Sequence, residues 1–158
     1  MSIHSIAYDE TDRKLAIILM QDATLTNAAI GELIGLSASA TNERVRKLKA
    51  DDIIKKVVAL VDSHFMDMAL GAYIFVLVEW KDRDRTFIDG VTSHDNVLEC
   101  HHLTGEYSYM LKVRVADTKA LENFITDFLK GRMGATKTMT HIILSSPKDQ
   151  SIVCGETS

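Results

Sequence analysis

Two short helices separated by a glycine are the feature that most restricts what this chain can fold into. The first, at residues 26–34, carries its apolar side chains on one side: Ile30, Leu33 and Ile34. The second, at residues 37–49, opens with Ser37, whose hydroxyl can accept a hydrogen bond from an unpaired backbone N–H of the first turn. Gly35 leaves only a short turn between them. Two helices joined in this way are typical of a helix-turn-helix.

The second of these helices has one apolar side and one cationic side. Val45 and Leu48 lie three residues apart and can be buried together. Small polar side chains at the front and cations towards the back suit a helix that enters the major groove by its N-terminus. We therefore predict that these residues contact DNA: Ser37, Ser39, Ala40, Asn42, Arg46, Lys47 and Lys49. The alternative is a plain antiparallel helix pair whose charged face is only solvated.

Arg44 lies in the same helix, but two roles are open to it. It can contact a phosphate, or it can serve the fold by pairing with Glu32 or Glu43. The helix ends without a glycine, so Asp51 or Asp52 is expected to take the left-handed conformation. Before the pair, Asp9 or Thr11 is expected to cap a first helix, in which the apolar side chains again share one side: Leu15, Ile18 and Leu19.

The charge of the chain restricts how it can bind nucleic acid. Its 158 residues carry a formal net charge of -4, with a pI of about 5.8. A protein that only coats nucleic acid would be basic, so any DNA affinity must come from a local patch such as residues 44–56. The length allows one large domain or two small ones, and the contrast between a cationic segment and an acidic remainder favours two regions with different tasks.

No residue pattern indicates a metal site, a cofactor site or a catalytic site. Cys100 and Cys154 are far apart and are expected to be free thiols in a reducing cytosol. Cys100 and His102 would share one face of a strand, but two ligands do not make a zinc site. There is no signal peptide and no uncharged apolar stretch long enough to span a bilayer, so a cytoplasmic protein without membrane partners is expected.

The second half of the chain alternates strands and helices. Residues 53–61 are rich in β-branched side chains and are predicted to form a strand, and residues 62–69 an irregular connector. Residues 84–93 form a short helix with Phe87, Ile88 and Val91 inward, and the helix that Asp117 caps has its apolar residues at i, i+3, i+4, i+7 and i+8. The strands that accompany them are predicted at residues 72–78, 96–103, 107–115 and 136–145.

From residue 71 the predicted order is therefore β-α-β-β-α-β, the split ferredoxin-like arrangement. A four-stranded sheet with both helices on one face leaves its other face bare. A second copy of the chain is the simplest cover for that face, so a homodimer is expected.

Two motifs resemble the Lrp/AsnC regulators. Residues 36–48, with residues 9–15 before them, resemble the helix-turn-helix of that family. Residues 97–113, which include the Thr104-Gly105-Glu106-Tyr107-Ser108-Tyr109 hairpin, resemble the signature of its second domain, and residues 134–138 also match. The resemblance runs from about residue 8 to residue 148.

The resemblance implies an α+β protein in two parts. A winged helix-turn-helix domain at residues 1–52 is followed by a strand and linker at 53–70, a ferredoxin-like βαββαβ domain at 71–147 and a tail at 148–158. Such proteins bind double-stranded DNA, dimerise, assemble further to tetramers or octamers, and sense small molecules, often amino acids. The positions matching the family's effector site are His102, Thr104, Gly105, Glu106, Tyr107, Ser108, Thr118, Lys130, His141 and Ile142.

The sequence departs from the family pattern at Thr24, Asp52 and Ser108, where arginine, glycine and aspartate are usual. The third departure replaces a charged partner for an α-amino group by a neutral hydroxyl, so a plain leucine response is not expected. Two alternatives remain: a regulator without an effector, in which Ser108 only fills an interface, and an enzyme, because sirohaem decarboxylases resemble the same two-domain fold.

Overall fold

The computed structural model of the chain describes residues 8–78 and 84–149. These residues divide into two compact units, one that includes the described residues up to Ala59 and one that includes those from Leu60 to Lys148. The change of unit falls inside residues 53–70, where the sequence places a linker. Most of the expected tail at residues 148–158, with Cys154, lies outside the described residues.

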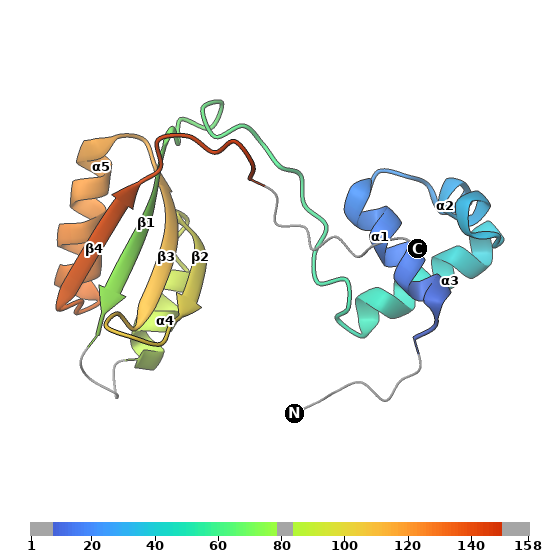
Figure 1. Ribbon diagram of the computed structural model, residues 1–158, viewed down its shortest axis with the longest axis horizontal. Coiled ribbons are helices and arrows are strands. Elements are labelled where there is room, and N and C mark those ends of the chain that lie inside the picture. Colours follow the sequence, from blue (N-terminus) through green and yellow to red (C-terminus); the bar gives the residue numbers. More distant parts are fainter. Residues whose placement is uncertain (1–7, 79–83, 150–158) are drawn as a thin grey trace. The chain divides into compact units, whose positions relative to one another are not determined.

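Three helices make up the first unit: α1 Glu10–Gln21, α2 Asn27–Ile34 and α3 Ala38–Ala50 (Figure 1). A polar side chain caps each of them. The oxygens of Asp9, Thr26 and Ser37 accept backbone N–H bonds from the first turn at 2.8, 3.2 and 3.2 Å, respectively. The caps expected of Asp9 and Ser37 are confirmed. Each cap fixes where its helix begins, because it satisfies a donor that has no partner inside the helix.

The core of this unit is small and comes from all three helices. Leu15, Ile30, Val45 and Leu48 are buried at its centre. Leu33, predicted to share one side of the helix with Ile30 and Ile34, is instead 67% exposed, whereas Ile30 is fully buried. The buried side of α2 is centred between Ile30 and Gly31, about 100° per residue around the helix, which turns Leu33 away from the core.

Gly31 is where α2 and α3 come closest. A Cβ on this residue would lie 2.5 Å from the carbonyl oxygen of Leu36 and 3.0 Å from Oγ1 of Thr41. Thr41 is fully buried, and its hydroxyl donates to the carbonyl of Ser37 at 3.0 Å. The angle between the two helices of the helix-turn-helix therefore depends on the missing side chain at position 31.

The chain after α3 differs from the prediction. Asp52 takes the left-handed conformation with φ 57°, as expected of one of the two aspartates. Residues 53–61 do not form the predicted strand, and no wing follows α3 in the part of the chain that the structure describes. A strand satisfies its backbone groups only by pairing with another strand, and none of the described strands lies against this segment. β-branched composition alone does not create that partner.

The apolar side chains of this segment are in water as a result. Val57, Val58, Leu60 and Val61 are each more than half exposed, Leu60 at 85%. Residues 57–61 form what is called the open segment below. Such a run of uncharged β-formers is suited to strand pairing with a second chain.

The second unit is one antiparallel sheet with helices on a single face. Its strands are β1 Leu70–Leu77, β2 Val97–His102, β3 Tyr109–Val115 and β4 Lys137–Ile142, in the spatial order β2-β3-β1-β4 (Figure 1). Helix α4 Asp84–Thr92 joins β1 to β2, and a helical segment joins β3 to β4. The predicted βαββαβ order is confirmed.

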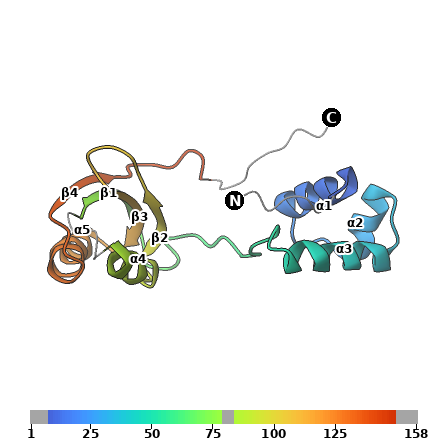
Figure 2. The ribbon, with the colours of Figure 1, turned by 90° about the horizontal axis from the view of Figure 1, so that it is seen from below.

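Alternation along β1 separates the two faces of the sheet. Ala72, Ile74 and Val76 are fully buried beneath the helices, while Tyr73 and Phe75 point to the other face and are only half-buried. Figure 2 shows α4 and α5 on the same side of the sheet. The face without helices is called the open face below.

Two details of the helices differ from the expectation. Ile88, predicted to point inward with Phe87 and Val91, is 38% exposed, whereas the other two are buried. The long helix is α-helical only over α5 Thr118–Asn123 and continues as the π-helix η2 Phe124–Arg132. Apolar residues at i, i+3 and i+4 fit both an α-helix and a π-helix over so short a stretch. The periodicity of the sequence therefore did not distinguish these two helix types.

Candidate DNA interface and effector site

The exposed side of α3 carries most of the residues predicted to contact DNA. Ser39, Asn42 and Arg46 follow one another at i, i+3 and i+7 and are all exposed. Lys47 and Lys49 are exposed beside this row, in the last turn of the helix. The structure thus brings polar side chains and cations together on one accessible surface, called the recognition row below.

Two other predicted DNA contacts are less available. Ser37 is exposed, but its hydroxyl oxygen is engaged as the cap of α3. Ala40 is half-buried. Both lie at the end of the helix that would enter a groove first, where backbone N–H groups can also contact phosphate.

Arg44 serves the fold, but not through the partners expected. Its Nη1 lies 2.7 Å from Oδ1 of Asp12 and 2.9 Å from Oδ2 of Asp9, both at the start of α1, rather than against Glu32 or Glu43. Asp12 is buried, and it also accepts the backbone N–H of Asp9, which completes a capping box. The three side chains form a clasp, called the Arg44 clasp below, between α1 and the recognition helix.

The ionisation of the clasp follows from this geometry. Hydrogen bonds to Asp12 and Asp9 raise the pKa of Arg44 above its usual value. The backbone N–H of Asp12, and then Arg44, lower the pKa of Asp9. The partners are 32 and 35 residues away from Arg44, so nothing local in the sequence identified them.

A tyrosine in front of α1 contacts the far end of α3. The hydroxyl of Tyr8 donates to Oδ2 of Asp51 at 3.0 Å, and Nζ of Lys47 lies 5.3 Å from the centre of the tyrosine ring. Desolvation, followed by the contact with Asp51, raises the pKa of Tyr8. The sequence analysis did not identify Tyr8. Its ring holds the ammonium group of Lys47 through a cation–π contact and so restricts where Lys47 lies beside the recognition row.

The hairpin between β2 and β3 holds the first group of predicted effector residues. The backbone N–H of Leu103 donates to the carbonyl of Ser108 at 2.8 Å and closes the turn, and Gly105 has φ 116°, a conformation that favours glycine. The ring of His102 stacks on Tyr109 at 4.9 Å. Thr104 and Glu106 are exposed at the turn.

Glu106 and Tyr107 are engaged with the start of β4. Nζ of Lys137 donates to Oε1 of Glu106 and lies 5.5 Å from the centre of the Tyr107 ring. The bond to Glu106 raises the pKa of Lys137. Tyr107 also contacts Phe75 of the open face, with the two ring centres 6.0 Å apart.

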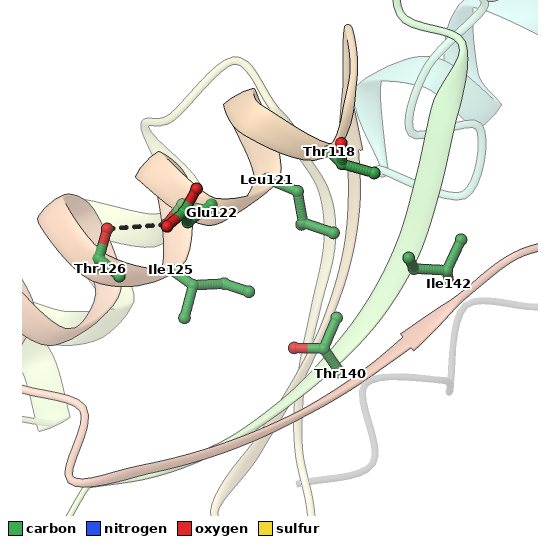
Figure 3. A pocket seen from close by; sticks show the side chains of 7 residues that line it. All are labelled: Thr118, Leu121, Glu122, Ile125, Thr126, Thr140 and Ile142. Carbon is green, nitrogen blue, oxygen red and sulfur yellow. Dashed lines mark hydrogen bonds between the residues drawn. The ribbon is translucent and has the colours of Figure 1, made fainter.

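Other predicted effector residues lie at the opposite end of the sheet. Thr118 and Ile142 line a pocket of about 400 Å³ between the helical segment and β4, together with Leu121, Glu122, Ile125, Thr126 and Thr140. Figure 3 shows the helix residues and the β4 residues of this pocket facing one another, with the Thr126 hydroxyl bonded to the Glu122 carbonyl. The pocket is mostly apolar with hydroxyls at its rim.

A single chain therefore does not bring all the predicted effector residues together. Lys137, which pairs with the hairpin, and Ile142 stand at opposite ends of β4, about 17 Å apart at 3.4 Å per residue. His141 is exposed on the open face, with its ring 5.8 Å from that of Phe75, and Lys130 is exposed on η2.

The remaining chemistry of the described residues is sparse. Among residues 8–78 and 84–149 there is no group of three His, Cys, Asp or Glu side chains arranged to hold a metal ion. Cys100 is half-buried against the core, and burial raises the pKa of its thiol. No helix within those ranges has the length and apolar character needed to cross a membrane.

A helix-turn-helix with an exposed recognition row, joined to a βαββαβ unit, defines a class of two-domain, DNA-binding transcription regulators. Comparison with known families places the chain within that class. Residues 9–49 match the AsnC-type helix-turn-helix domain, and residues 71–153 match the Lrp/AsnC ligand binding domain. The chain belongs to the Lrp/AsnC family of transcription regulators.

Individual relatives agree with this assignment. Transcriptional regulator AzlB of Bacillus subtilis (strain 168) is 32% identical over 145 residues, covering 90% of this chain and 92% of the relative. The leucine-responsive regulatory protein of Escherichia coli (strain K12) is 27% identical, covering 90% and 88%. A transcriptional regulator of Neisseria meningitidis, solved in complex with L-Met, matches with a TM-score of 0.86 and 28% identity over 94% of this chain and 97% of that one. These relatives are regulators, and nothing in the comparisons supports the decarboxylase alternative.

Proposed function

We propose that this regulator reads its operator through the recognition row of α3 and that its function is regulation rather than catalysis. Ser39 and Asn42 contact base edges, while Arg46, Lys47 and Lys49 neutralise phosphates; the N-terminal turn with Ser37 and Ala40 enters the groove first. The observation that carries the proposal is the exposed row itself, on a helix that the Arg44 clasp fixes to α1. The cytoplasm is the proposed place of action.

The first experiment removes two phosphate cations and measures the salt dependence of binding. Operator DNA is selected from a random pool with the wild-type protein, and Kd is followed by fluorescence anisotropy at several salt concentrations. Arg46→Ala/Lys47→Ala is expected to weaken binding to all sequences alike and to reduce the salt slope by about one unit for each cation lost, which is about four units for a dimer with two recognition helices on the DNA.

The matched control is Arg13→Ala/Lys14→Ala, which removes the same charge from exposed positions of α1 in the same unit. It is expected to leave the salt slope within half a unit of the wild type. Equal slopes for both double variants would rule out α3 as the reader.

The effector proposal starts from the hairpin. A small molecule with a carboxylate binds at the Thr104-Gly105-Glu106 turn, where Gly105 lets a ligand approach the backbone closely, and residues of a second copy complete the site. A second copy is needed because Thr118, Lys130, His141 and Ile142 lie elsewhere on the chain. The L-Met complex of the Neisseria meningitidis regulator makes an amino acid the first candidate.

Calorimetry with the amino acids, L-Met among them, tests this site. Ser108→Asp restores a charged partner for an α-amino group and is expected to tighten binding of one amino acid by about tenfold. If neither protein binds any amino acid while the assembly state is unchanged, the effector-independent alternative holds. Glu106 is already paired with Lys137, so it is less available as a partner for the α-amino group of a ligand.

The assembly proposal is a homodimer through the open face, with further association to a tetramer or octamer. Tyr73, Phe75 and Met139 lie on that face and are incompletely buried in the single chain. Two recognition helices related by a two-fold axis would then meet successive major grooves about 34 Å apart, or a multiple of that spacing.

A further inference from the structure

The recognition row is not made by α3 alone. Asn27, the first residue of α2, donates from its Nδ2 to Oδ1 of Asn42, and the two atoms are 3.0 Å apart. Asn27 is half-buried and Asn42 is exposed. The contact links the two helices of the helix-turn-helix at their accessible surface.

We propose that Asn27 is a positioning residue for base recognition: it holds the Asn42 amide so that Asn42 reads its base by donating hydrogen bonds. The inference rests on the proposed function, since it requires α3 to lie in the major groove. Asn42 held in this way recognises a base whose major-groove edge presents hydrogen-bond acceptors.

The orientation of the Asn42 amide follows from two features of α2. Its oxygen accepts the N–H of Asn27, and Asn27 is the first residue of α2, the end of the helix where unpaired backbone N–H groups make the potential positive. An oxygen is favoured there and a second NH₂ group is not. The Nδ2 group of Asn42 is then directed away from α2, with both N–H donors available.

An amide group that can only donate suits guanine. In the major groove guanine presents the adjacent acceptors N7 and O6, whereas adenine pairs with an Asn side chain through one donor and one acceptor. An Asn42 whose oxygen is engaged by Asn27 is therefore expected to select guanine at the base pair it meets, by roughly tenfold over the other bases.

Asn27 can be changed without removing the cap of α2. The cap is Thr26, whose Oγ1 accepts the N–H of Ala29 at 3.2 Å, and the side chain of Asn27 takes no part in it. Asn27→Ala is thus expected to leave the thermal transition within about 2 °C of the wild type, in keeping with other surface changes.

The experiment is a double-mutant cycle in which the measured quantity is the preference for one base over the others at each operator position. An operator is selected with the wild-type protein, and Kd is measured for all four bases at each position with wild type, Asn42→Ala, Asn27→Ala and the double variant. The position whose preference Asn42→Ala abolishes is the one that Asn42 reads. Asn27→Ala is expected to reduce preference at that same position by about three- to tenfold, and to have no further effect in the Asn42→Ala background.

Asn27→Asp tests the proposal through the identity of the preferred base. A residue with only a structural role would not change that preference. A carboxylate at position 27 accepts from Nδ2 of Asn42, so the amide turns over and Oδ1 faces the DNA. The preferred base is then expected to change from guanine to one that presents a donor, cytosine or adenine. The added negative charge lowers the affinity for every sequence by the same factor. The ratio of Kd values between two bases at constant salt is therefore unaffected by that loss.

Three results would overturn the inference. They are a wild-type preference for adenine at the Asn42 position, an Asn27→Ala effect that is equal on all sequences and additive with Asn42→Ala, and an unchanged preference in Asn27→Asp. If instead the wild type selects no sequence at all, and the salt slope does not respond to Arg46→Ala/Lys47→Ala, the proposed function itself is wrong. The two failures are therefore distinguishable.

Discussion

Three charged side chains set the position of the recognition helix. Arg44 lies between the carboxylates of Asp9 and Asp12, and those two aspartates also cap α1. The side chain of Asp12 is only 7% exposed, so its oxygens rely on these hydrogen-bond partners in place of water. The sequence marks Asp9 and Asp12 as residues near a helix start and Arg44 as a cation within α3, but the pairing itself appears only when α1 and α3 pack together.

The clasp predicts a specific response to acid. The pKa of Asp9 is lowered below its ordinary value of 3.8, so its contribution to stability is present above that pH and is lost as the pH falls through the lowered pKa. Asp9→Asn keeps a good N-cap but cannot ionise. The difference in Tm between wild type and Asp9→Asn is expected to be largest near neutral pH and to disappear at low pH.

Thermal denaturation followed by circular dichroism from about pH 7 to pH 2.5 measures that difference. Glu32→Gln is the control, because Glu32 is an exposed carboxylate of α2 that takes no part in the Arg44 clasp. A Tm difference for Asp9→Asn that does not change with pH would show that the carboxylate acts only as a cap.

At the scale of elements, the crossing of α2 and α3 depends on Gly31. Gly31→Ala would place a Cβ 2.5 Å from the Leu36 carbonyl oxygen, a backbone atom that cannot turn aside as a side chain can. We expect a loss of roughly 1–3 kcal/mol in the free energy of unfolding, as for other over-packed sites. Denaturant titration of the helix signal measures it.

Gly35→Asn is the comparison for that variant. Gly35 caps α2 in the left-handed conformation at φ 73°, and nothing lies within 4 Å of the position of its Cβ. Asparagine tolerates this conformation, so the expected loss is below about 1 kcal/mol. A cost for Gly31→Ala no larger than that for Gly35→Asn would mean that the two helices can separate freely.

Local signals predicted the elements well, and long-range pairing accounts for what they missed. The caps at Asp9, Ser37 and Asp117 mark helix starts correctly, since a cap bonds within its own first turn. The strand predicted over residues 53–61 was wrong because a strand requires a neighbour. Of the candidate site, the exposed row of α3 was predictable from spacing, whereas Tyr8 and Asn27 were not, since each meets α3 only after folding.

At the scale of the whole molecule, apolar surface in the single chain is the dominant feature. On the open face, Met139 lies opposite Phe75 in the strand register and is 39% exposed. In the open segment, Leu60 is 85% exposed. A patch of this kind is typical of a surface that another chain covers. The assembly proposed above would cover the open face.

Charge placed on one side of the sheet tests this. Met139→Lys is expected to drive the protein towards the mass of a single chain, 17.6 kDa, because a buried ammonium would have no partner in the interface. Ile88→Lys adds the same charge at a side chain of nearly the same exposure, 38%, on the helical layer, and is expected to leave the mass unchanged. Light scattering after size exclusion gives both masses; a Met139→Lys variant with wild-type mass would exclude the open face as the interface.

The open segment also bears on how the chain survives in a cell. Its five residues carry no charge and no proline, and they are flanked by Lys55 and Lys56 on one side and Asp62 on the other. Charges in those places act as gatekeepers, because they oppose the stacking of identical strands into aggregates. Newly synthesised chains that have not met a partner expose this segment to proteases and chaperones, whereas paired chains would not. The amount of the regulator in a cell would then follow its rate of synthesis more steeply than in proportion, since dilute chains are degraded before they pair.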